Sequence, residues 1–103
     1  MKSYFLHAIL DVAAAENGLD RLLPLQRRPW IMVNEAGDPV AYVDLRGLNT
    51  DYEGLGDPAG AGPMVQADIS GRHYGDDEPV LAFLRQLQEI AGGLLMDDFD
   101  NVL

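Results

Sequence analysis

Side chains that could do chemistry gather in residues 70–76, whose sequence is Ser-Gly-Arg-His-Tyr-Gly-Asp. The stretch follows an alternating apolar segment and supplies a hydroxyl, a guanidinium, an imidazole and a carboxylate. In open α/β sheets, ligands bind beyond the carboxyl ends of strands, which is where this stretch falls. We therefore expect a small-molecule or anion site, or a minimal active site, at Ser70, Arg72, His73 and Asp76.

The serine, histidine and aspartate of this stretch do not form a recognisable triad motif. No Gly-x-Ser-x-Gly pattern surrounds Ser70, and that pattern is the usual mark of a nucleophilic serine on a strand-to-helix turn. Arg72 and His73 could instead hold a small anion, together with the N-terminus of the following helix. A polar loop that caps this helix would contain the same residue types without binding a ligand. The sequence thus holds no complete catalytic set and no cofactor motif, which favours a non-enzymatic protein.

The densest acidic cluster is formed by Asp97, Asp98 and Asp100. Clustered carboxylates are the ligands that Mg²⁺ and Ca²⁺ prefer. The cluster lacks the central glycine and the distal glutamate of an EF-hand loop, so we predict no metal there and retain a divalent-cation site as an alternative. We expect these three acids to contact a partner instead.

A basic patch, Arg27-Arg28-Pro29-Trp30, interrupts this otherwise acidic chain. Arginine beside tryptophan is typical of the residues that dominate the binding energy of protein interfaces. We expect Arg27, Arg28 and Trp30 to contact a partner. In the alternative interpretation, Trp30 anchors a strand in the core and the arginines balance the acidic half of the chain.

Charge is the strongest signal in the composition of this 103-residue chain. Seven basic against seventeen acidic residues give a net charge of −10, most of it in residues 51–103. The electrostatic field of this negative charge repels phosphate backbones and anionic lipid, so it disfavours nucleic acid and membrane surfaces as partners and suits a basic protein.

Cysteine is absent, so no disulfide or thiolate chemistry is available. No signal-peptide pattern or membrane-spanning run is evident, and we expect a cytoplasmic protein.

Hydrophobic periodicity predicts six elements. A helical period covers residues 4–16, where Phe5, Ile9 and Val12 share one face. The other predicted elements are a hairpin of residues 30–33 and 40–45, a strand at 65–69, a helix at 78–91 and a strand at 94–96. Residues 46–63 contain five glycines and two prolines, and we expect them to be irregular.

These elements predict one α+β domain over residues 1–103, in the order α-β-β-β-α-β. A two-layer sandwich, with a four-stranded mixed sheet and both helices on one face, is the simplest way to bury the apolar stripes. The strands that flank the second helix should pair in parallel. The uncovered face would display Gln66, Asp68 and Ser70 as a binding or dimerisation surface.

Size, charge and an open sheet face together favour a non-enzymatic interaction or regulatory module, of an accessory, inhibitor or immunity type. Its partner would be another protein or a second copy of the chain in a homodimer, bound through the acidic second half and the open face. A small-molecule or anion-binding protein and a divalent-cation-binding protein are the alternatives.

Overall fold

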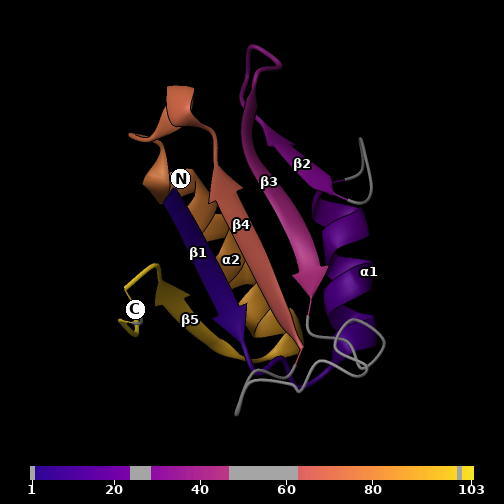
Figure 1. The fold of residues 1–103 in the computed structure, drawn as a ribbon. Coiled ribbons are helices and arrows are strands. Elements are labelled where there is room, and N and C mark those ends of the chain that lie inside the picture. Colours follow the sequence, from indigo (N-terminus) through magenta and orange to yellow (C-terminus); the bar gives the residue numbers. More distant parts are fainter. Residues whose placement is uncertain (1, 24–28, 47–62, 100) are drawn as a thin grey trace, which may run out of the picture.

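One antiparallel sheet with helices on one of its faces makes up the fold (Figure 1). The computed structural model describes residues 2–23, 29–46, 63–99 and 101–103. The strands are β1 (Lys2–His7), β2 (Trp30–Val33), β3 (Pro39–Arg46), β4 (Met64–Ile69) and β5 (Leu94–Asp97). The helices are α1 (Val12–Leu22), α2 (Asp77–Ala91) and a short 3-10 turn, η2 (Gly71–His73). The predicted α+β class is confirmed, whereas the sheet has five antiparallel strands instead of four in a mixed arrangement.

The first predicted element is wrong in its first half, because residues 2–7 form a strand. Tyr4 and Leu6 are buried, whereas Phe5 and His7, the residues that follow each of them, are more exposed, which fits the period of a strand. The chain then turns at Ala8, which has a positive φ of 54°. The helix begins only after Asp11, whose side chain accepts a hydrogen bond from the Ala14 amide at 3.0 Å, and it continues to Leu22.

This misassigned strand sits inside the sheet and decides its topology. The strand order is β2-β3-β4-β1-β5, so β1 separates the two strands that flank α2. Because β1 runs antiparallel to both neighbours, β4 and β5 are parallel to one another without being paired, as in a split β-α-β unit. The predicted parallel pairing is therefore wrong. Leu6 on one face and Phe5 on the other give β1 the apolar character on both faces that suits an interior strand.

The remaining predicted elements are confirmed. The hairpin strands pair as expected, and the Asn34 side chain organises their turn by accepting from the amides of Ala36 (2.9 Å) and Asp38 (3.0 Å). The alternating strand, the long helix and the last strand lie within a residue or two of their predicted bounds. Of the segment expected to be irregular, residues 47–62 lie outside the described residues.

The core lies between the sheet and the two long helices. Helices α1 and α2 approach closely at Gly18, where an added Cβ would lie 3.0 Å from Leu87 Cδ1. Gly18 lies within α1, and the absence of a side chain there permits this contact. Trp30 is the largest fully buried side chain, and its Nε1 donates to Asp20 Oδ1 at 3.0 Å, which ties β2 to α1. Neither helix in the described residues is long and apolar enough to cross a lipid bilayer.

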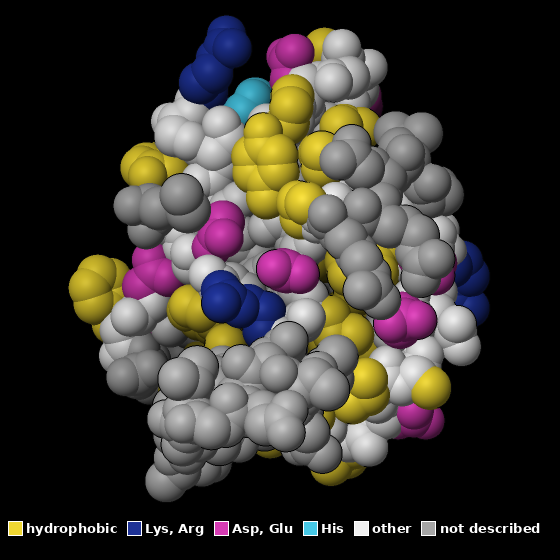
Figure 2. Space-filling view, turned by 45° about the vertical axis from the view of Figure 1, so that its right-hand side comes forward, with side chains coloured by type: hydrophobic (Ala, Val, Ile, Leu, Met, Phe, Trp, Pro, Cys, Tyr) yellow, Lys and Arg dark blue, Asp and Glu magenta, His cyan; other side chains and the backbone are white. Residues whose placement is uncertain are grey.

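None of the described helices covers the opposite face of the sheet, and we call it the open face (Figure 1). The register of the three inner strands places on it side chains whose neighbours along each strand point into the core. They are Ser3, Phe5 and His7 from β1, Tyr42, Asp44 and Arg46 from β3, and Met64, Gln66 and Asp68 from β4. Figure 2 shows acidic, basic and apolar side chains intermixed over this side of the molecule. The predicted placement of Gln66 and Asp68 is confirmed.

Candidate functional site

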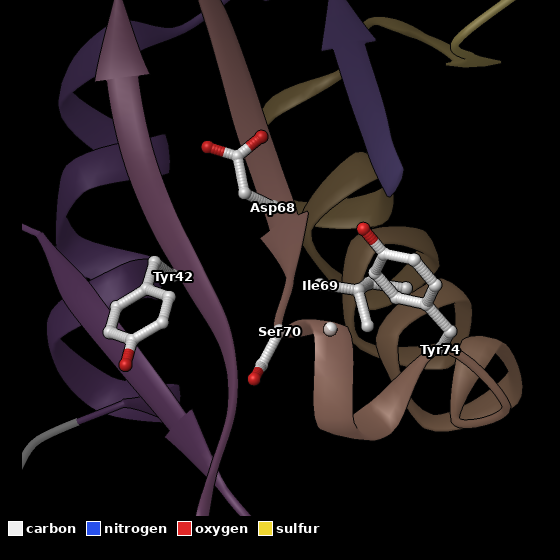
Figure 3. Close-up of a pocket in the computed structure, with 6 residues that line it drawn as sticks. Tyr42, Asp68, Ile69, Ser70 and Tyr74 are labelled. Atoms are coloured by element: carbon white, nitrogen blue, oxygen red, sulfur yellow. The ribbon is translucent and has the colours of Figure 1, made fainter. Parts of the chain in front are cut away.

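An open pocket of about 630 Å³ lies at one end of the open face, where β3 and β4 meet the segment that follows β4. Its lining consists of Tyr42, Asp68, Ile69, Ser70, Gly71 and Tyr74 (Figure 3). This lining combines aromatic and aliphatic surface with one carboxylate and hydroxyl groups, and none of its described residues is basic. Pockets that bind ligands commonly have this composition, in which a few polar groups are set in an apolar wall.

Two tyrosines flank the pocket from different parts of the fold. Tyr42 comes from β3 and Tyr74 follows η2, and Figure 3 shows their rings on opposite sides of Ser70. Their side chains are exposed, at 40% for Tyr42 and 44% for Tyr74. Exposed aromatic rings on either side of a carboxylate supply both apolar contact area and the negative ring faces that attract cations.

The Asp68 carboxylate is oriented by a row of hydrogen bonds that crosses three strands. Asp68 Oδ1 accepts from the Ser3 hydroxyl at 2.5 Å and from Gln66 Nε2 at 2.9 Å. Gln66 Oε1 in turn accepts from Arg46 Nη1 at 3.3 Å. Both donors to Asp68 reach the same oxygen, so the described part of the chain leaves Oδ2 without a donor. The network fixes the orientation of the carboxylate.

Ser70 continues the wall of the pocket beyond the end of β4. Its amide donates to the Val40 carbonyl at 2.8 Å, and its carbonyl accepts from the His73 amide at 2.8 Å. These bonds occupy the backbone groups of Ser70, while its hydroxyl makes no hydrogen bond to the described residues. The Ser70 hydroxyl is thus a second polar group available in the pocket (Figure 3).

The four residues expected to form a ligand site do not converge on one cavity. Ser70 lines the pocket, whereas Arg72, His73 and Asp76 do not. His73 Nδ1 lies 2.9 Å from Asp76 Oδ2, and Asp76 precedes α2 without capping it through its side chain. Within the described ranges, no hydrogen bond joins the Ser70 hydroxyl to the His73 ring, so a serine triad is not assembled.

A second polar cluster fixes the segment that carries Tyr74. Lys2 Nζ lies 2.8 Å from Asp77 Oδ2 and donates to the Tyr74 carbonyl at 3.1 Å. The Tyr4 hydroxyl also donates to Asp77. Burial, followed by the hydrogen bond to Asp77 and its negative charge, raises the pKa of Tyr4 to about 12. The hydrogen bonds from Lys2 and then Tyr4 lower the pKa of Asp77. These contacts join β1 to the start of α2 and hold the Tyr74 backbone in place.

Stability is expected to fall as the pH rises from 10 to 12. Across that range the unfolded state, with an ordinary tyrosine pKa of 10.0, loses its proton while folded Tyr4 keeps it until about pH 12. Unfolding then releases up to about one proton, which favours the unfolded state progressively. The measurement is urea unfolding at intervals from pH 9 to 12. Tyr4→Phe should flatten this dependence, whereas Tyr42→Phe, at an exposed tyrosine, should leave it; equal slopes in wild type and Tyr4→Phe would contradict the assignment.

The acids near residue 100 make internal contacts. Asp97 Oδ1 accepts from the amides of Phe99 (2.8 Å) and Asn101 (3.0 Å), and its Oδ2 accepts from Asn101 Nδ2 at 3.1 Å. These bonds, the one from the Asn101 amide foremost, lower the pKa of Asp97. Asp98 accepts the Ser3 amide with both oxygens, at 2.9 and 3.0 Å. Asp100 lies outside the described residues. Asp97 and Asp98 thus organise the turn after β5 and its contact with β1.

Trp30, which was also predicted to contact a partner, lies in the core. Trp30 is 2% exposed and faces the core, so its indole is not presented to a partner. This matches the alternative interpretation, in which Trp30 anchors a strand. Arg27 and Arg28 lie outside the described residues. No group of three or more histidine, aspartate or glutamate side chains in the described part of the chain is arranged to hold a metal ion.

Sequence patterns did not single out the two tyrosines of the pocket. Tyr42 does carry a signal, because it alternates with Ala41 and Val43 and must therefore point away from the core. Tyr74 carries none, because nothing local shows that its ring lies beside the end of β4 (Figure 3). No protein-family model, curated protein or solved structure matches this chain significantly, so the geometry alone supports the functional interpretation.

Proposed function

We propose that the protein is a non-enzymatic interaction module whose open face binds a basic segment of a partner protein. The observation that carries this proposal is the pocket between Tyr42 and Tyr74, with the oriented Asp68 carboxylate in its wall. Tyrosine is enriched at protein interfaces because its ring buries a large area at small entropic cost, while its hydroxyl remains able to hydrogen-bond.

Charge complementarity identifies the kind of partner. The chain carries a net charge of −10, and the open face adds the exposed Asp44 to Asp68. Arg46, the basic side chain on this face, already donates to Gln66. A basic segment would therefore meet carboxylates near the pocket and would be drawn toward the molecule by its overall field. The same negative field would repel an anionic ligand.

Nuclear magnetic resonance can test the proposal with short synthetic peptides of opposite charge. A peptide of alternating arginine, lysine and glycine is expected to shift amide signals of β3 and β4 on the open face, whereas a glutamate-substituted peptide of equal length shifts none. Because the attraction is partly long-range, raising the salt concentration should weaken binding. Shifts confined to the helix layer, or no shifts with the basic peptide, would contradict the proposal.

Variants that each neutralise one carboxylate test whether the open face is the part of the protein that attracts the basic peptide. Asp68→Asn and Asp44→Asn are expected to raise the Kd of the basic peptide by about 3-fold or more each, because each removes a carboxylate from the binding face. Glu89→Gln makes the same charge change at an exposed position on α2 and should change the Kd by less than about 2-fold. An equal effect of all three variants would show non-specific attraction to an acidic protein.

A further inference from the structure

We infer that the pocket between Tyr42 and Tyr74 receives the guanidinium of an arginine side chain from the partner, an inference that rests on the proposed function. Among the described residues, its wall contains one carboxylate and no basic group, a composition that favours a cation. Its volume of about 630 Å³ falls in the range of roughly 300–1,000 Å³ typical of ligand pockets. It can therefore admit a long side chain together with part of the flanking backbone.

The acceptors in the pocket match a forked donor. Asp68 lies in β4 and Ser70 directly follows the end of this strand, and both residues line the pocket (Figure 3). Among the described contacts, Asp68 Oδ2 and the Ser70 hydroxyl receive no donor, since Ser3 and Gln66 both reach Oδ1. A guanidinium presents five N–H donors in one plane and can serve two separate acceptors at once.

The aromatic flanks match a planar cation. Tyr42 and Tyr74 stand on opposite sides of Ser70 with much of each ring exposed (Figure 3). Arginine stacks its flat, weakly hydrated guanidinium on aromatic rings, whereas the lysine ammonium is a compact and strongly hydrated point charge. The combination of a carboxylate oxygen, a hydroxyl and two ring faces therefore selects arginine over lysine.

The parts of the pocket are held in place before a ligand arrives. Ser3 and Gln66 orient Asp68, and the Ser70 amide is bonded to the Val40 carbonyl on β3. Lys2 holds the backbone of Tyr74 through its carbonyl. Groups that are already oriented lose little entropy on binding, which increases both affinity and selectivity.

The test is calorimetric titration with three peptides of identical sequence except at a central arginine, lysine or citrulline, which is the uncharged isostere of arginine. The arginine peptide is expected to bind about 10-fold more tightly than the lysine peptide, and the citrulline peptide more weakly than either. Tyr74→Ala and Tyr42→Ala should each weaken the arginine peptide by about 5-fold or more and bring the arginine-to-lysine ratio close to one. Both tyrosines are substantially exposed, so these variants should fold, which their melting temperatures will confirm.

Control measurements separate this inference from the proposed function. Asp44→Asn changes a carboxylate on the same face outside the pocket lining, and it should weaken the arginine and lysine peptides equally. Equal affinity for arginine and lysine in the wild type, unchanged by the tyrosine variants, would overturn the inference while leaving a basic-segment module in place. Absence of binding by every peptide would overturn both. Binding of N-acetylarginine amide as tightly as the arginine peptide would overturn the assignment to a protein partner and indicate a small-molecule site.

Discussion

Replacing Gly93 with alanine is expected to lower the free energy of unfolding by about 3 kcal/mol or more. Gly93 has φ +113°, a conformation that side chains with a Cβ rarely adopt. An added Cβ would also lie 2.8 Å from the carbonyl oxygen of His7 and 3.1 Å from Leu6 Cγ. The backbone oxygen belongs to the interior strand β1 and cannot move without disturbing the sheet. Strain and overpacking therefore add together at this position.

Gly37→Ala is the matched control for this prediction. Gly37 also has a positive φ, of 84°, but nothing lies within 4 Å of the position its Cβ would take. Gly37→Ala should therefore lower the free energy of unfolding through backbone strain alone, by about 1 kcal/mol. Equilibrium unfolding in urea measures both variants. Equal destabilisation by the two substitutions would show that the close approach of Gly93 to β1 costs nothing.

Trp30→Ala is expected to destabilise the protein by about 3–5 kcal/mol. The indole is 2% exposed, fills the core beneath β2 and β3, and is bonded to Asp20 on α1. Its removal would leave a large cavity and also break the contact between β2 and the helix layer. The measurement is again urea unfolding, followed by circular dichroism because this variant lacks the one tryptophan of the chain.

Trp30→Phe keeps the test decisive if the alanine variant does not fold. Phenylalanine retains most of the apolar contact but loses the indole N–H, and we expect it to cost about 1–2 kcal/mol. Because Trp30 faces away from the open face, this variant should bind the basic peptide as the wild type does. A folded Trp30→Phe protein of unchanged stability but much weaker binding would return Trp30 to the role of a contact residue.

Local patterns predicted the parts of the fold whose evidence is contained in a short segment. The hairpin turn is determined by Asn34 and its neighbours, and the apolar stripe of α2 repeats over its whole length. The prediction of a helix over residues 4–16 was wrong in its first half because a helical and a strand hydrophobic period overlap there. Phe5, Ala8, Ile9 and Val12 fit a helical face, while Tyr4 and Leu6 fit a strand that is buried only when β4 and β5 lie beside it. Those partners are distant in the sequence.

The candidate site was predicted less well, for the same physical reason. Ser70 and Asp68 were identified because they follow from the alternation in β4. The pocket also needs Tyr42 and Tyr74, which are brought together by the pairing of β3 with β4 and by the contact of Lys2 with the Tyr74 carbonyl. Composition suggested that Asp97 and Asp98 were free for a partner, but composition cannot show that backbone amides of the turn and of Ser3 already occupy them.

The position of β1 between β4 and β5 also governs how the chain can fold during synthesis. Among the described strands, β1 pairs with β4 at residues 64–69 and with β5 at residues 94–97, which are both synthesised long after it. At about 5–20 residues per second, β1 waits on the order of 5–20 s before both neighbours exist. During this interval both of its edges and its apolar side chains are exposed to other chains. Shielding of β1 in the nascent chain therefore matters more here than in a sheet whose neighbouring strands follow one another in the sequence.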